Sequence, residues 1–193
     1  MIRRWICCLL VIFLSRVATC HAAATDSPDF DAVAQIGARS QPARFHFACS
    51  ENDGPNLTGV LSVKLETLQY EQLRPVFDFD PFEGPDAHAG ALSDLRSSGA
   101  SGTAENRFAA SGSAVEGNGA MAFALEIDAS RREPGPLRKL AAVLRPLLDG
   151  PAKLVWHQGN AVKSAAPLIA TLELSRAEAA ELRDVLTPCM RGR

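Results

Sequence analysis

The stretch FDFDPFEGPDAH, residues 77–88, places four carboxylates and a histidine within twelve residues. These groups are Asp78, Asp80, Glu83, Asp86 and His88. Such a cluster could form a calcium loop, an acid–base pair or a partner-binding loop. A solvated turn is the fourth possibility, and the choice decides whether the protein is an enzyme.

The spacing of the cluster does not fit a metal loop or a catalytic pair. An EF-hand requires oxygen ligands at positions one, three and five, glycine at six and glutamate at twelve. Counted from Asp78, position five is Phe82 and position twelve is Ala89. Asp78 and Asp80 are two residues apart, so on an extended chain they share one face and repel each other. We therefore expect no metal, no cofactor and no catalytic residues here.

The remaining interpretations are a solvated turn and a partner-binding loop. Phe77 and Phe79 alternate with the two aspartates, which predicts buried rings and solvated carboxylates. Three rigid or turn-forming residues follow, at positions 81, 84 and 85, and should hold the next segment out of regular structure. We expect this stiff loop to expose an aromatic tip and to bind a partner through Phe82, Glu83, Asp86 and His88.

Other chemical motifs are weak. The histidines, among them His46 and His157, lack metal-ligand spacing and are expected on the surface or rim of strands. No G-x-S-x-G nucleophile elbow occurs. A basic stretch surrounds the segment 136–150, and it is either a solvated face or a surface for an anionic partner or lipid headgroup. The candidate residues of that surface are Arg131, Arg132, Arg138 and Lys139.

The N-terminus has the layout of a secretory signal peptide. Two arginines precede an apolar run of about ten residues, and Ala22-Ala23-Ala24 provides a cleavage site. We therefore expect residues 1–24 to be removed and the protein to be periplasmic or secreted. The alternative is a lipid anchor at Cys20, because Val17-Ala18-Thr19-Cys20 resembles a lipobox. No later apolar run is long enough to predict a membrane span.

The net charge and the cysteines indicate which partners and which cross-link to expect. The signal segment holds three of the 20 basic residues and no acid, which leaves 17 basic and 22 acidic residues and a net charge of −5. This balance argues against nucleic acid as a partner. Cys49 and Cys189 remain after cleavage, both on predicted inward faces, and export favours a disulfide between them.

Hydrophobic periodicity predicts three strand pairs and two main helices. The strand pairs are 44–49 with 59–67, 107–115 with 120–128, and 153–158 with 167–174. Asn118-Gly119 predicts a tight hairpin in the second pair. The helices are 136–150, which Pro146 should end or kink, and one that begins at the capping box Ser175-Arg176-Ala177-Glu178 and ends before Pro188.

These elements predict an α+β fold. We expect a mostly antiparallel sheet of about six strands in strand–strand–helix units, with helices on one face and one disulfide. Residues 25–42 are predicted to be a loose leader, and residues 43–193 a single domain with an insertion at 76–105. The three units share a weak internal repeat, which could be a duplication or a chance recurrence of short apolar words.

The function expected from these features is non-enzymatic. The first hypothesis is an exported binding protein that neutralises or chaperones another protein of the cell envelope, as inhibitors and immunity proteins do. The second is a structural or accessory component of an envelope or secretion assembly, which lipidation of Cys20 would favour. The third is a hydrolytic enzyme.

Overall fold

The computed structural model describes residues 27–51, 59–82, 93–115, 119–128, 134–160 and 165–190. The predicted signal segment 1–24, including Cys20, lies outside these residues. Nine described strands form one antiparallel sheet in the order β5-β4-β8-β9-β1-β2-β3-β7-β6. The strands are β1 (Asp29–Ile36), β2 (Arg39–Glu51), β3 (Gly59–Thr67), β4 (Ser93–Gly99), β5 (Gly102–Phe108), β6 (Ser111–Val115), β7 (Ala120–Asp128), β8 (Ala152–Gln158) and β9 (Leu168–Leu174).

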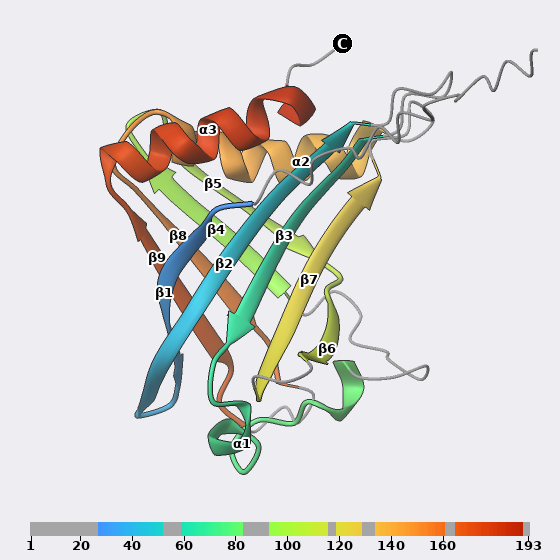
Figure 1. Ribbon diagram of the computed structural model, residues 1–193. Coiled ribbons are helices and arrows are strands. Elements are labelled where there is room, and N and C mark those ends of the chain that lie inside the picture. The colour runs from blue at the N-terminus through green and yellow to red at the C-terminus, as the bar shows by residue number, and fades with distance from the viewer. Residues whose placement is uncertain are drawn as a thin grey trace, which may run out of the picture.

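The sheet curls into a half-barrel (Figure 1). Its two edge strands, β5 and β6, are separated in sequence only by Ala109 and Ala110. This link requires one end of each edge strand to lie close to the other, so a sheet of this width must curl rather than stay open. Residues on one side of every strand therefore face a common concave interior.

The two longer helices cover one end of the half-barrel. The helical elements are α1 (Tyr70–Leu73), the 3-10 turn η1 (Asp80–Phe82), α2 (Pro134–Leu144), the 3-10 turn η2 (Arg145–Leu148) and α3 (Arg176–Met190). Figure 1 shows α2 and α3 across the same end of the sheet, with α1 at the other end. The buried residues of α2 and α3 include Leu140, Val143, Leu144, Leu182 and Leu186.

The predicted α+β fold was wrong, because the described chain is a nine-stranded half-barrel with three short α-helices. Part of the predicted leader, residues 25–42, forms β1 and the start of β2. The predicted insertion, residues 76–105, contains β4 and most of β5. These strands were missed because small or polar residues carry much of their inward face: Ala32 and Ala34 in β1, and Ser93 and Ser97 in β4.

Several local predictions are confirmed. The predicted pairs 44–49 with 59–67 and 153–158 with 167–174 correspond to the antiparallel pairs β2–β3 and β8–β9. The predicted pair of 107–115 with 120–128 is right only in part: residues 111–115 form β6 and pair with β7, whereas Arg107 and Phe108 belong to β5 at the opposite edge of the sheet. Gly119 has the positive φ of 63° that a tight turn requires. The α-helical part of α2 ends at Leu144, where the chain tightens into the 3-10 turn that contains Pro146. The predicted stop before Pro188 was wrong, because α3 continues to Met190.

The capping box at the start of α3 is confirmed. The Ser175 amide donates a hydrogen bond of 2.7 Å to Glu178 Oε2, and the Glu178 amide donates one of 3.3 Å to Ser175 Oγ. These hydrogen bonds hold the pKa of the Glu178 carboxyl below its ordinary value. The helix therefore begins at a defined residue, next to the end of β9.

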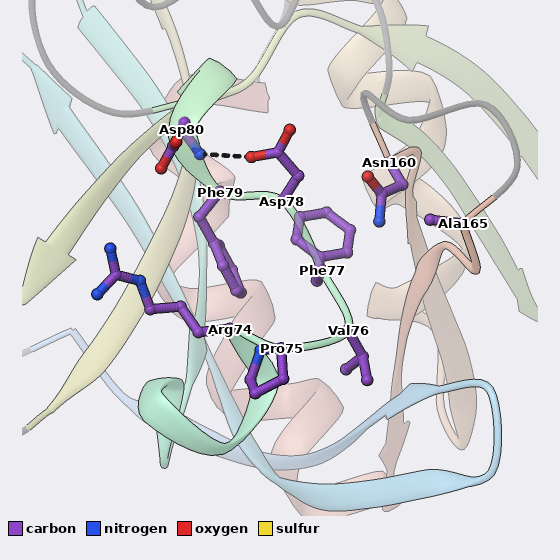
Figure 2. A pocket seen from close by; sticks show the side chains of 9 residues that line it. All are labelled: Arg74, Pro75, Val76, Phe77, Asp78, Phe79, Asp80, Asn160 and Ala165. Carbon is purple, nitrogen blue, oxygen red and sulfur yellow. Dashed lines mark hydrogen bonds between the residues drawn. The ribbon is translucent and has the colours of Figure 1, made fainter.

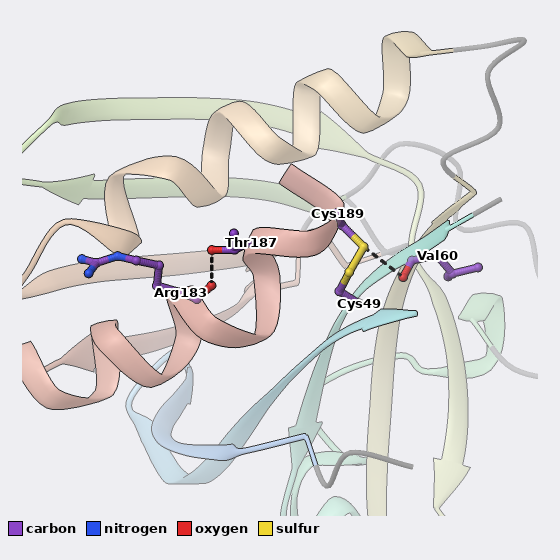
Figure 3. Close-up of a disulfide and its surroundings, with 5 residues drawn as sticks. All are labelled: Cys49, Val60, Arg183, Thr187 and Cys189. Carbon is purple, nitrogen blue, oxygen red and sulfur yellow. Dashed lines mark hydrogen bonds between the residues drawn. A yellow bond between two sulfur atoms is a disulfide. The ribbon is translucent and has the colours of Figure 1, made fainter. Parts of the chain in front are cut away.

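The predicted disulfide between Cys49 and Cys189 is confirmed. It joins β2 to the last turn of α3, with a Cα–Cα distance of 5.8 Å across a sequence separation of 140 residues (Figure 3). Cys49 follows Phe45 and Phe47 on the inward face of β2, and both rings are fully buried. The disulfide therefore fixes the second-to-last residue of α3 to the rim of the half-barrel.

Candidate functional site

Three features of the described chain carry groups that could bind or react: the acidic motif, a groove beside α2, and a charged row on the outer face of the sheet. In the acidic motif, Phe77 and Phe79 are buried, while Asp80 is exposed and Asp78 is half-buried. This confirms the predicted alternation of core rings and solvated acids. Asp78 Oδ1 accepts a hydrogen bond of 3.2 Å from the Asp80 amide, so one acid holds the turn that presents the other.

The rings of the motif join a cluster of five aromatic residues, which we call the aromatic plug: Tyr70, Phe77, Phe79, Phe82 and Phe123. Successive ring centroids lie close, at 4.9 Å between Tyr70 and Phe79 and 4.7 Å between Phe77 and Phe79. The plug fills the concave interior beneath β7. The motif is therefore first a structural segment that completes the core.

Phe82 belongs to this plug and is not an exposed tip. Its relative exposure is 0%, and its ring centroid lies 5.2 Å from that of Phe123. A Cβ atom on Gly112 of β6 would stand 2.5 Å from the Phe82 Cβ atom, so the glycine is required for this close approach. The predicted exposure of Phe82 was wrong. The other predicted loop residues, Glu83, Asp86 and His88, lie outside the described residues.

A pocket of about 380 Å³ lies beside the plug (Figure 2). Its lining comes from the segment 74–80 and from Asn160 and Ala165. Arg74 stands 5.7 Å from the centre of the Tyr70 ring, which places its guanidinium against the plug. Asn160 Nδ2 donates a hydrogen bond of 3.4 Å to the Ala166 carbonyl. The polar groups of this pocket thus hold neighbouring chain segments together.

A second and larger hollow, of about 550 Å³, runs along α2, and we call it the α2 groove. Its walls come from four places in the sequence: the β4–β5 turn with β5, α2, the following 3-10 turn, and the end of α3. In Figure 3, α2 passes the end of α3 that carries Cys189. The lining residues are Ser101, Thr103, Ala104, Leu137, Arg138, Ala141, Ala142, Arg145, Pro146, Cys189 and Met190.

The α2 groove is apolar at its floor and basic at its rim. Ala104 and Ala141 are small and half-buried, while Arg138 and Arg145 are exposed. None of the described lining residues is acidic, and within the part of the chain that the structure describes neither guanidinium forms an ion pair. The groove can therefore accept a negatively charged group together with apolar atoms.

Only part of the predicted surface for an anionic partner lies at the α2 groove. Arg138 lines the α2 groove, whereas Lys139 is exposed on α2 but is not part of the lining. Arg131 and Arg132 lie outside the described residues. Arg145, which belonged to the basic stretch but not to the predicted surface, does line the groove. No sequence signal indicated the opposite wall, because Ser101 and Thr103 lie in the predicted insertion, residues 76–105.

The outer face of the sheet carries a row of charges across β1, β2 and β3. His46 Nδ1 lies 2.5 Å from Asp29 Oδ1, and its Nε2 lies 3.1 Å from Glu66 Oε2. Lys64 Nζ donates a hydrogen bond of 2.9 Å to Glu66 Oε1. Burial raises the pKa of the Glu66 carboxyl, but the interactions with Lys64 and His46 outweigh burial and hold that pKa below its ordinary value.

Glu66 should therefore make the free energy of unfolding depend on pH in the acidic range. A carboxyl with a lowered pKa in the folded state contributes its full stabilisation above its ordinary pKa and loses it as the pH falls through the lowered value. We expect Glu66→Gln to be less stable than the wild type near neutral pH, and the difference to shrink as the medium becomes more acidic than the ordinary glutamate pKa. Urea unfolding at a series of pH values measures this. A difference independent of pH would contradict it.

A second charged row crosses β5, β4 and β8. Arg107 Nε donates a hydrogen bond of 2.8 Å to Asp94 Oδ1, which raises the pKa of the exposed guanidinium. His157 Nδ1 lies 3.9 Å from Asp94 Oδ2. His46 and His157 are half-buried side chains on the outer face, as expected for residues at the rim of strands. Both rows tie neighbouring strands together, and none of their residues lines either of the two hollows described above.

Among the described residues, no group of three or more histidine, cysteine or acidic side chains could hold a metal ion. No helix in this part of the chain is both long and apolar enough to cross a membrane. No family model, no curated protein and no solved structure matches the chain.

Proposed function

We propose that the protein is an exported, non-enzymatic binding protein that docks another protein of the cell envelope on the α2 groove. One observation supports this proposal above the others: the groove combines an apolar floor with two exposed guanidiniums, and none of the described residues that line it is acidic. Arginine and methionine are enriched at protein interfaces, and Arg138, Arg145 and Met190 supply both here. The partner is expected to present an acidic surface with apolar side chains.

The proposed binding surface is the α2 groove and not the acidic motif. Phe82 is buried in the aromatic plug, so it cannot anchor a partner without leaving the core. The guanidiniums of the α2 groove are accessible instead. An inhibitor- or chaperone-like role requires a stable scaffold that presents such a surface, and α2 packs on a half-barrel to which the disulfide ties α3. A rigid surface reduces the ordering cost of binding.

Charge reversal tests the proposal. The exported wild-type protein is immobilised and incubated with envelope extract, beside the double variant Arg138→Glu/Arg145→Glu and the control Lys139→Glu, which changes a charge on α2 outside the groove lining. We expect one partner to be retained by the wild type and the control and lost by the double variant. The purified partner should then bind with an affinity that weakens as salt rises.

Two results would contradict this function. One is a partner whose affinity is equal for the wild type and the double variant, which would place its binding surface elsewhere. The other is a partner lost equally by Lys139→Glu and by the double variant, which would indicate a diffuse basic surface rather than the groove. Circular dichroism of each variant establishes that the fold is intact.

A further inference from the structure

We infer that Cys189 is a site of thiol–disulfide exchange: a thiol that enters the α2 groove attacks Cys189 Sγ and opens the bond to Cys49. This adds a reaction to the surface proposed for docking, and small thiols probe it without any protein partner. It therefore holds or fails independently of the proposed function. Three features of the structure support it: the access to each sulfur, the direction of the bond and the charge of the groove.

The two sulfur atoms of the disulfide differ in access. Cys189 is one of the residues that line the α2 groove, and Cys49 is not among the described lining residues. Cys49 lies on the inward face of β2, next to the buried ring of Phe47, and its strand pairs with β3 as far as Glu51. Exchange occurs at the sulfur that the attacking thiolate can reach, so Cys189 is the preferred target.

The direction of the bond also favours attack on Cys189. A thiolate bonds to one sulfur of a disulfide and displaces the other, so it approaches in line with the bond. In Figure 3 the bond points from β2 towards α3, and α2 lies beyond Cys189. The groove beside α2 is the hollow that Cys189 lines. A thiolate in the groove can therefore approach Cys189 Sγ from the side opposite to Cys49.

The rim of the groove favours a thiol that carries additional negative charge. The thiolate is the reacting form of a thiol, and nearby positive charge stabilises it. Arg138 and Arg145 supply two exposed guanidiniums, and none of the described lining residues is acidic. A thiol with a carboxylate or sulfonate should concentrate here, whereas a thiol with an ammonium group should be repelled. The co-reactant is therefore expected to be an acidic thiol.

Each exchange step balances in atoms and electrons. The incoming thiolate forms a bond to Cys189 Sγ, and the electron pair of the old bond leaves on Cys49 Sγ, which takes up a proton from water. A second thiol group of the co-reactant then attacks the co-reactant sulfur of this mixed disulfide and releases Cys189 as a thiolate. The protein gains two electrons and two protons, and the co-reactant becomes a disulfide.

Opening the bond frees a weakly held end of α3. Pro188 lies inside the helix and lacks the amide that would bond to the Asp184 carbonyl. The buried residues of α3 all precede this turn, and the last of them is Leu186. The disulfide is therefore the main tie for Cys189 and Met190, which form one wall of the groove. Exchange at Cys189 should loosen that wall.

Peptide mapping identifies the sulfur that is attacked. The oxidised wild-type protein is treated briefly with 2-mercaptoethanesulfonate, quenched with acid and alkylated with N-ethylmaleimide. Trypsin then separates the two cysteines, because Cys49 lies in the peptide 45–64 and Cys189 in the peptide 184–191. We expect the sulfonate adduct on Cys189 to exceed that on Cys49 by about tenfold or more in the folded protein, and this excess to shrink towards equality in urea.

Charged thiols test the groove as the route of attack. The rates with 2-mercaptoethanesulfonate and with the cation cysteamine are each divided by the rate of the same thiol with the urea-unfolded protein. At low salt we expect the sulfonate to exceed cysteamine by about threefold to fivefold. The formal net charge of the chain is −2 and would favour the opposite order. The preference should be lost in Arg138→Gln/Arg145→Gln and kept in Lys139→Gln.

Equal adducts on the two cysteines of the folded protein, an excess on Cys49, or no opening without urea would overturn the assignment of Cys189. A lack of preference for the sulfonate, or a preference that survives the loss of both arginines, would overturn the groove as the route. The proposed function is judged separately, because loss of the purified partner upon reversal of both arginines is measured with the disulfide intact.

Discussion

Replacing Phe82 by alanine is expected to lower the free energy of unfolding by about 3–5 kcal/mol, the usual cost of truncating a buried phenylalanine. Phe82 is fully buried, and its ring packs against Phe77 and Phe123 with centroid distances of 6.0 Å and 5.2 Å. Gly112 fixes the backbone of β6 close to it, so the surrounding chain has little freedom to collapse into the cavity. Urea unfolding with the disulfide intact measures the change.

Two neighbouring variants make this result specific. Phe82→Leu retains most of the apolar volume and should cost much less than Phe82→Ala. Asp80→Ala removes an exposed carboxylate two residues away and should change stability by about 0.5 kcal/mol or less. If Phe82→Ala were as mild as Asp80→Ala, Phe82 would not belong to the core, and the aromatic plug would have to be redrawn.

The acidic motif shows how far sequence reasoning reaches. The alternation of Phe77 and Phe79 with Asp78 and Asp80 correctly predicted which side chains are buried, because the chain there is extended and successive side chains point in opposite directions. The same reasoning failed at Phe82, where the chain enters the 3-10 turn η1. Proline and glycine indicated a break in regular structure, but a turn can direct an aromatic ring inward when the sheet curls over it.

Local strand pairs could be predicted from the sequence, but the total number of strands in the sheet could not. Hairpins with aliphatic alternation, such as β8–β9, were evident, because burial selects large apolar residues at every second position. Strand β4 was not, since its inward face includes Ser97 and Gly99. A Cβ atom on Gly99 would stand 2.1 Å from the Pro146 carbonyl oxygen, so the close approach of η2 requires the residue that hides the strand from pattern analysis.

The sequence indicated only one wall of the α2 groove, the wall formed by α2. Arg138 lies in a basic stretch that the sequence displays, but its partners in the lining come from β5 and from the end of α3. Nothing in the local pattern indicates that Thr103 and Met190 should line the same hollow. That proximity follows from the curl of the sheet, which brings β5 under α2, and from the disulfide that holds α3 in place.

The double variant Cys49→Ala/Cys189→Ala is expected to lose up to about 5 kcal/mol of stability, since the chain-entropy model gives this value for a closed loop of more than 100 residues. The cross-link joins residues 140 apart in sequence and removes many conformations of the unfolded chain. Packing losses should be small, because the cysteines are only partly buried. Urea unfolding of the oxidised wild type against the double variant measures the effect.

Reduction of the wild type by a dithiol distinguishes the cross-link from the side chains. If the cross-link is responsible, the reduced wild type and the double variant should unfold at nearly the same urea concentration. The alternative is that only the last turn of α3 is released, in which case the global midpoint would scarcely move while amide exchange near Thr187 would accelerate. Cys189 also lines the α2 groove, so both reduction and the double substitution should loosen one wall of the groove. A double variant that kept both the wild-type midpoint and slow exchange at the end of α3 would show that the apolar stripe of Leu182 and Leu186 holds this helix without the disulfide.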